Sequence, residues 1–183
     1  MDELKNLSIG GIIMKKLFFA IGLFFTPFLV FGLPDLRDSY LTEQCHAVGI
    51  SVPVARAILF QDNQGLDPTA CPFKNDGGQD MGLFRINSDY EWNDFVSYYW
   101  DRDGEFQWDD PFHNMYIAVR YIKWLYDIFD DLPMPTLQTK TFIVALAYNC
   151  GVGAFFKGEI PQASVDYAKA VVYMVWGIRA TWS

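Results

Sequence analysis

Histidine is scarce in this chain of 183 residues, which has only two, His46 and His113. Neither stands near a pair of cysteines, whereas zinc sites combine Cys and His ligands at short, regular spacings. We therefore expect no metal ion, and no motif of the sequence indicates a cofactor.

Cysteine is scarce as well, with Cys45, Cys71 and Cys150. A disulfide is allowed in an exported protein. We expect a bridge between Cys45, near the end of the first helix, and Cys71, in the loop after the second, with Cys150 free. The alternative is three free, mostly buried thiols.

Basic residues are few relative to acidic ones, 14 against 22, and the formal net charge is −8. Binding to nucleic acid needs a basic face, so we expect no nucleic-acid partner. Anionic membrane surfaces are disfavoured for the same reason. An uncharged sugar backbone remains compatible with this charge.

An apolar run long enough to span a membrane is also lacking. Residues 17–32 are 16 in number, short of the roughly 20 that a spanning helix needs. Two lysines precede this run, and Val30 and Gly32 fit a signal-peptidase site, which predicts a signal peptide at about residues 14–32 and cleavage before Leu33. The alternative is an uncleaved membrane anchor.

The chain therefore divides into an N-terminal extension with a signal peptide, residues 1–32, and one folded domain, residues 33–183. We expect the domain in the periplasm or outside the cell. Contact with a membrane is expected only through the N-terminal segment.

Aromatic residues are abundant, and apolar residues recur at helical spacing. Gly and Pro punctuate the pattern, and no internal repeat interrupts it. The pattern predicts an all-α domain with a small irregular lobe. The expected helices are residues 36–48, 53–63, one or two short ones in 88–110, 111–129, 136–149, and a last one that starts at 161 or 164.

The aromatic-rich segment 88–110 allows two interpretations. Pyranose faces pack on aromatic rings, so these side chains could form a sugar-stacking wall, with Trp92 as the best candidate. The alternative is ordinary core packing of large rings.

Three blocks of residues carry a family signature. The first runs from Asn63 to Pro68 (NQGLDP) and continues after a polar loop as Asp80 to Asn87 (DMGLFRIN). The second is AYNCG at residues 147–151, and the third is Ile160-Pro161 followed by Tyr167. In order and spacing they resemble the lytic transglycosylases of the lysozyme-like superfamily, above all the small secreted ones that accompany secretion and conjugation systems.

The resemblance implies a single lysozyme-like domain that acts on peptidoglycan glycan strands. In that family one Glu serves as acid and then as base, the bond between MurNAc and GlcNAc breaks, and a 1,6-anhydro-muramyl end forms. The resemblance adds secretion-system components as partners and implies no cofactor.

The chain departs from the family pattern at its most important position. Asn63 stands where the family has the catalytic Glu, and an amide gives up no proton at useful pH. Arg85 replaces a Gln and Cys150 an Ala. The sequence therefore leaves two alternatives: an inactive wall-binding or scaffold module, or an enzyme with a relocated acid.

Asp62 is the adjacent candidate for a relocated acid. One residue along a helix rotates a side chain by about 100°, so we expect Asp62 to point away from the cleft unless the helix ends early. The substrate-binding residues implied by the resemblance are Asp80, Gly82, Leu83, Arg85, Asn87, Trp92, Tyr148 and Asn149.

Several of these residues also have structural interpretations. Gly82 suits a close approach of the backbone. Arg85 could pair with a muramyl carboxylate or, as plain structure, with Asp80 or Glu91. The alternatives for the others are a loop-shaping role for Asp80, a core position for Tyr148, and stabilisation of a helix end by Asn149.

Overall fold

The structure is a computed structural model that describes residues 35–69, 79–87, 90–134 and 136–177, with the backbone alone at residues 35 and 90–94. All of them lie in one unit, Gly32–Ser183. The expected signal peptide lies outside the described residues. No helix among the described residues is both long and apolar enough to cross a membrane.

The first two helices are α2 (Asp35–Val48) and α3 (Val52–Asp62), close to their predicted ranges. Leu41 and Cys45 of α2 are fully buried. Leu36, expected on the same side, is instead 71% exposed because it lies in the first turn of the helix, one turn before the half-buried Tyr40. A bidentate ion pair joins the two helices, from Arg56 to Asp38.

Helices α5 and α6 are the two long helices of the core, and capping residues fix their ends. Helix α5 (Pro111–Ile128) begins after Asp110, whose carboxylate accepts the N–H groups of Phe112 and His113 at 2.8 and 3.1 Å. Helix α6 (Leu137–Cys150) begins after Thr136 and ends at Gly151, which has a φ of 83°.

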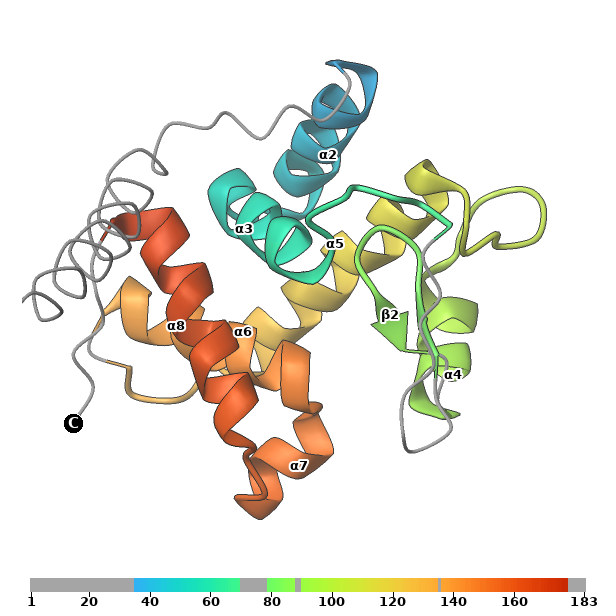
Figure 1. Ribbon diagram of the computed structural model, residues 1–183. Coiled ribbons are helices and arrows are strands. Elements are labelled where there is room, and N and C mark those ends of the chain that lie inside the picture. Colours follow the sequence, from blue (N-terminus) through green and yellow to red (C-terminus); the bar gives the residue numbers. More distant parts are fainter. Residues whose placement is uncertain (1–34, 70–78, 88–89, 135, 178–183) are drawn as a thin grey trace, which may run out of the picture. The chain divides into compact units, whose positions relative to one another are not determined.

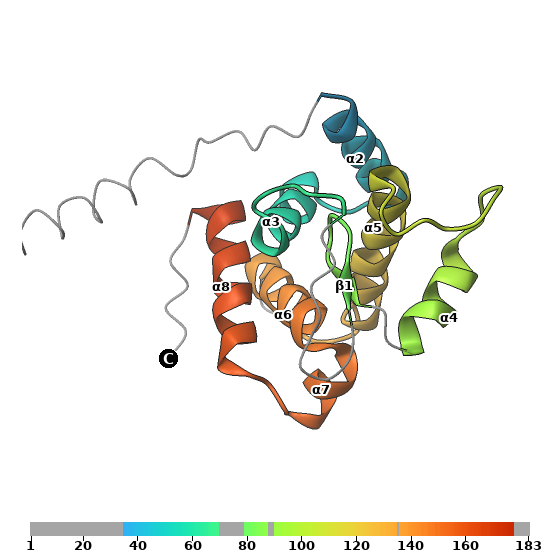
Figure 2. The same cartoon turned by 45° about the vertical axis from the view of Figure 1, so that its right-hand side comes forward.

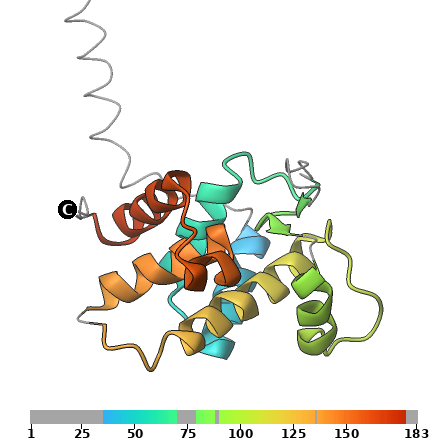
Figure 3. The same cartoon turned by 90° about the horizontal axis from the view of Figure 1, so that it is seen from below.

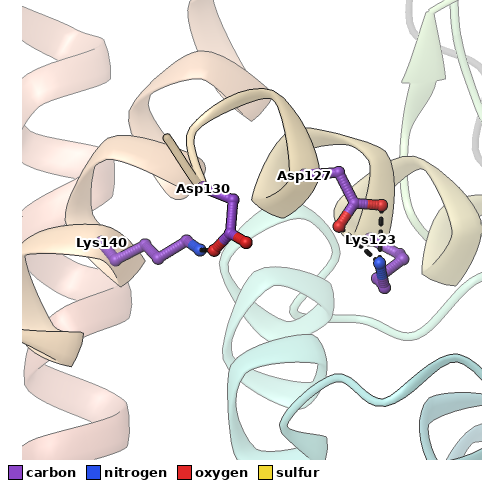
Figure 4. Close-up of polar contacts among 4 residues, drawn as sticks. All are labelled: Lys123, Asp127, Asp130 and Lys140. Atoms are coloured by element: carbon purple, nitrogen blue, oxygen red, sulfur yellow. Dashed lines mark hydrogen bonds and ion pairs between the residues drawn. The ribbon is translucent and has the colours of Figure 1, made fainter. Parts of the chain in front are cut away.

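Ion pairs hold the exposed side of this region. Lys123 pairs with Asp127 one turn further along α5, and Lys140 of α6 reaches back to Asp130 in the connection between the helices (Figure 4). Exposed pairs of this kind contribute about 0–1 kcal/mol each, so they support the fold rather than decide it.

The last helix, α8 (Gln162–Trp176), packs on α6 and α3 (Figures 1 and 2). Their contact surfaces include Val144, Ala147, Ala168 and Val171, which are fully buried. Small side chains let these helices approach closely. A short helix, α7 (Val152–Lys157), connects α6 to α8 and was not expected from the sequence.

A small hairpin forms the irregular lobe. Strand β1 (Asp80–Met81) pairs antiparallel with β2 (Ile86–Asn87), with Asp80 opposite Asn87. Helix α4 (Tyr90–Tyr99) follows and packs on α5, which lies between α4 (green) and α6 (orange) in Figure 3. The predicted all-α class with a small irregular lobe is confirmed.

Candidate active site

The end of α3 is the first part of the candidate site. The helix ends at Asp62, and Asn63 leaves helical geometry with φ −142° and ψ 76°. The Asn63 side chain is only 3% exposed. Its Nδ2 donates to the carbonyl of Asp67 at 2.7 Å, and its Oδ1 accepts the Asp67 N–H at 3.2 Å. Both ends of the amide therefore close the turn of residues 63–67.

Asp62, the candidate for a relocated acid, is the last residue of α3. Its carboxylate is close enough to two phenols, Tyr148 and Tyr167, to act on the pKa of both. The Oδ2 atom of Asp62 is buried. Helix α3 ends at Asp62, one residue before the predicted end, and an early end was the condition under which Asp62 was expected to face the cleft.

Tyr148 is the point where three segments of the chain meet. Its hydroxyl donates to the carbonyl of Phe84 in the hairpin at 2.8 Å. Burial raises the pKa of Tyr148 well above its usual value, and the negative charges of Asp62 and, more weakly, Asp80 act in the same direction. Tyr148 thus links α6 to the hairpin and lies within reach of the charge of Asp62.

Tyr167, from α8, is the second buried phenol of this site. Burial is also the main cause of the rise in its pKa, followed by the charge of Asp62. Asp62, Tyr148 and Tyr167, which we call the Asp62 cluster, combine one carboxylate and two phenols contributed by three helices. The Tyr148 hydroxyl already donates to Phe84, so the Tyr167 hydroxyl is the hydrogen-bond donor of this cluster that is available to Asp62.

The hairpin contributes Asp80 and Asn87, both predicted to bind substrate. Their side chains meet across the ladder, with Nδ2 of Asn87 donating to Oδ1 of Asp80 at 3.3 Å. This contact supports the loop-shaping alternative for Asp80. Leu83, by contrast, is fully buried. Its side chain belongs to the core, so it cannot touch a sugar in this structure.

Only glycine fits at position 82, because the side chain of Asn114 lies against it. Asn114 was not among the residues predicted for the site. At a φ of +77°, a Cβ on Gly82 would lie 2.3 Å from Nδ2 of Asn114. Asn114 is buried; it donates to the carbonyls of Met81 at 3.0 Å and Trp108 at 3.2 Å and accepts the Phe84 N–H at 2.9 Å. The close approach predicted at Gly82 is therefore to Asn114. A lone Asn inside an apolar helix was the available signal.

Arg85 closes the same turn in the left-handed region, with a φ of +49°. Among the described residues, its buried Nε has no hydrogen-bond partner. Its charge also helps to lower the pKa of Asp67, after the stronger effect of hydrogen bonds from Thr69. The side chain of Glu91, one of the expected partners, lies outside the described residues.

The remaining predicted residues contribute less to the site. Asn149 is exposed in the last turn of α6. Trp92 lies in α4, but its side chain is outside the described residues. Elsewhere in this segment, Phe95 packs on Tyr99, with ring centroids 4.2 Å apart, and on Trp124 of α5. These contacts fit the alternative of core packing for that part of the segment.

The cysteines differ from the predicted pairing. Cys45 is a free, fully buried thiol on the inner side of α2, and burial raises its pKa to about 12. The expected bridge from Cys45 is therefore not present, and Cys71 lies outside the described residues. Cys150 is free, as predicted. Within the described ranges, no group of His, Cys, Asp and Glu could hold a metal ion.

A family model described as the transglycosylase SLT domain matches residues 47–168. The chain belongs to this family. The match includes α3, the hairpin, α6 and Tyr167, and hence every residue of the Asp62 cluster. Searches of curated proteins and of solved structures gave no match. The resemblance to lytic transglycosylases is thereby confirmed, and the SLT domain relates this chain to peptidoglycan, a polymer of the periplasm or the cell exterior.

Proposed function

We propose that this SLT-domain protein cleaves peptidoglycan glycan strands at the bond between MurNAc and GlcNAc, with Asp62 as the acid and base. The observation that carries the proposal is the position of Asp62, at the end of α3 and beside the buried phenols of Tyr148 and Tyr167. Asp62 thus supplies, one residue earlier, the carboxylate that position 63 lacks.

The reaction needs one group that first gives and then takes a proton. Protonated Asp62 would deliver its proton to the glycosidic oxygen as the bond from that oxygen to C1 of the muramyl sugar breaks. The resulting carboxylate would then take the proton of the C6 hydroxyl as O6 bonds to C1, which gives the 1,6-anhydro end.

Asn63 is a poor candidate for any part of this chemistry. An amide holds hydrogen bonds but gives up no proton. Both polar atoms of its side chain also bond to the backbone of Asp67 within the turn. We therefore assign Asn63 the role of positioning Asp62 by fixing where α3 ends.

A second candidate function is an inactive wall-binding module, in the scaffold of a secretion apparatus. It is supported by Asn63, which stands where the resemblance puts the catalytic Glu of the family. Asp62 is also one methylene shorter than Glu, which limits its reach to the leaving oxygen. For both functions we propose export by a signal peptide at about residues 14–32, release of the domain 33–183, and a location in the periplasm or outside the cell.

The deciding experiment measures soluble muropeptides released from purified sacculi. Wild type is expected to release products with 1,6-anhydro ends, and Asp62→Asn to release about 10²–10⁴-fold less, the usual contribution of a general acid. Asp131→Asn, which changes an exposed carboxylate in the loop before α6, is the matched control. No release by wild type, with sacculi still bound, would favour the inactive module.

A further inference from the structure

A cavity of about 620 Å³ lies away from the Asp62 cluster. It is lined by α2, by the start of α5 and by the loop around residues 100–103, and it shares no residue with that cluster. Pockets of about 300–1,000 Å³ are the size that small ligands and single sugar units occupy. We call this cavity the Trp100 pocket.

Aromatic rings form one part of the pocket lining, and they are held in place by contacts of their own. Trp100 donates its indole N–H to the carbonyl of Gly104 at 2.9 Å and packs on His113, with ring centroids 4.4 Å apart. Tyr40 meets Phe112 edge to face at 5.1 Å. The rings are therefore positioned before any ligand arrives, which lowers the entropic cost of binding.

Donors form a second part of the lining. Nδ1 of His113 accepts the N–H of Gln107 at 3.1 Å, so the neutral imidazole carries its proton on Nε2 and presents a donor there. Arg102 adds a guanidinium, which lies 4.4 Å from the ring centroid of Tyr116. The hydroxyl of Tyr116 in turn donates to Asp101, so the base of this loop is ordered by hydrogen bonding.

Acceptors form the third part, namely the carboxylates of Asp101, Asp103 and Asp110. Three carboxylates disfavour an anion such as phosphate, because like charges repel. Arg102 offsets part of this negative charge and adds a donor to the lining. Donors and acceptors of both kinds around aromatic rings suit a neutral molecule that has hydroxyl groups on its edges and an apolar face.

We propose that the Trp100 pocket binds a neutral pyranose, such as an N-acetylglucosamine unit of a glycan strand. Ring faces contact the apolar face of the sugar, while the Asp carboxylates accept hydrogen bonds from its hydroxyls and Arg102 and His113 donate to them. The identification of the strand as peptidoglycan rests on the proposed function. The pocket would give the protein a second hold on the strand, apart from the bond that is cut.

The test uses the ¹⁵N-labelled protein and the trimer of N-acetylglucosamine as the probe. The indole N–H signal of Trp100, identified by its loss in Trp100→Phe, is expected to shift on titration. Arg102→Ala is expected to weaken binding about tenfold, as the loss of one charge-assisted hydrogen bond predicts. Because Arg102 is exposed, its replacement leaves the core intact, and Asp103→Ala provides a second exposed variant. Lys157→Ala, on α7, is the control and should bind like wild type.

Two results would overturn the inference. One is trimer binding without a shift at Trp100, with Arg102→Ala and Asp103→Ala both unchanged. The other is an equal shift of the Trp100 signal with inorganic phosphate or with lysine, which would show that a charged ligand occupies the pocket. Asp62→Asn separates this inference from the proposed function: it should lower release from sacculi about 10²–10⁴-fold and leave the Trp100 shift unchanged, so either proposal can fail alone.

Discussion

Two turns of this protein are each held by one buried asparagine, and their comparison shows how the site is built. Asn63 closes the turn after α3 with two hydrogen bonds to Asp67. Asn114 reaches the hairpin from α5 and bonds to Met81 and Phe84 on either side of Gly82. In both places the side-chain amide bonds to backbone N–H and C=O groups that have no partner within a helix or strand.

The two turns differ in what they do with the nearest carboxylate. In the hairpin, Asp80 accepts a hydrogen bond from Asn87 and so stabilises the lobe. At the end of α3, Asp62 lies beside Tyr148 and Tyr167 instead. The candidate acid therefore lies at a helix end beside the first turn, whereas the carboxylate of the hairpin is bonded within the lobe.

The largest effect is expected in the hairpin turn. Gly82→Ala places a Cβ 2.3 Å from Nδ2 of Asn114 and 2.5 Å from the carbonyl of Trp108, at a positive φ. We expect a loss of about 3 kcal/mol in the free energy of unfolding, from overpacking plus backbone strain. Gly104→Ala is the control: its φ is +89°, but no atom lies within 4 Å of the added Cβ, so about 1 kcal/mol is expected. Urea denaturation measures both, and equal losses would mean that Asn114 gives way.

The asparagines themselves test the comparison directly. Asn114→Ala leaves three backbone groups without their partner, and we expect a loss of about 3 kcal/mol. Asn63→Ala leaves the N–H and the carbonyl of Asp67 without their partner, and we expect a loss of about 1.5 kcal/mol in the free energy of unfolding. Thermal and urea unfolding give the ranking. A larger loss at position 63 would show that the α3 turn, and not the hairpin, is the more firmly built of the two.

Asn63→Glu asks which residue at the end of α3 does the chemistry. A Glu cannot donate to the carbonyl of Asp67, so we expect a loss of about 1 kcal/mol in stability and no gain in muropeptide release. Asn63→Gln, which keeps the amide and adds one methylene, controls for size. A gain of about 10²-fold in release by Asn63→Glu would assign the acid to position 63 and refute the role of Asp62.

The buried phenols predict the effect of alkaline pH. A tyrosine whose pKa is raised on folding keeps its proton in the folded state while the unfolded chain loses it, so stability falls as the pH rises above the ordinary value of 10.0. Tyr148→Phe should flatten this fall, and Tyr98→Phe, at a residue 80% exposed, is the control. Unfolding free energies measured between pH 8 and 11 would decide; a slope that Tyr148→Phe leaves unchanged would contradict the prediction.

Much of the fold could be predicted because its signals are local. Asp110-Pro111 marks the start of α5, and Gly151 marks the end of α6; each acts through its own backbone or its nearest neighbours. The site could be predicted only in part because its decisive contacts are not local. The side on which Asp62 lies depends on a single residue at the end of a helix. Asn114 stabilises the hairpin turn by accepting a hydrogen bond from Phe84, which lies 30 residues earlier in the sequence.

Phe84 is held by two helices at once. Its ring is fully buried, its N–H donates to Asn114 of α5, and its carbonyl accepts from Tyr148 of α6. The tip of the hairpin is thus fastened to the helical core at the same residue that orients the Tyr148 hydroxyl. A displacement of the lobe would therefore move the Tyr148 hydroxyl as well. A ligand that binds the hairpin would in this way also change the surroundings of the Asp62 carboxylate.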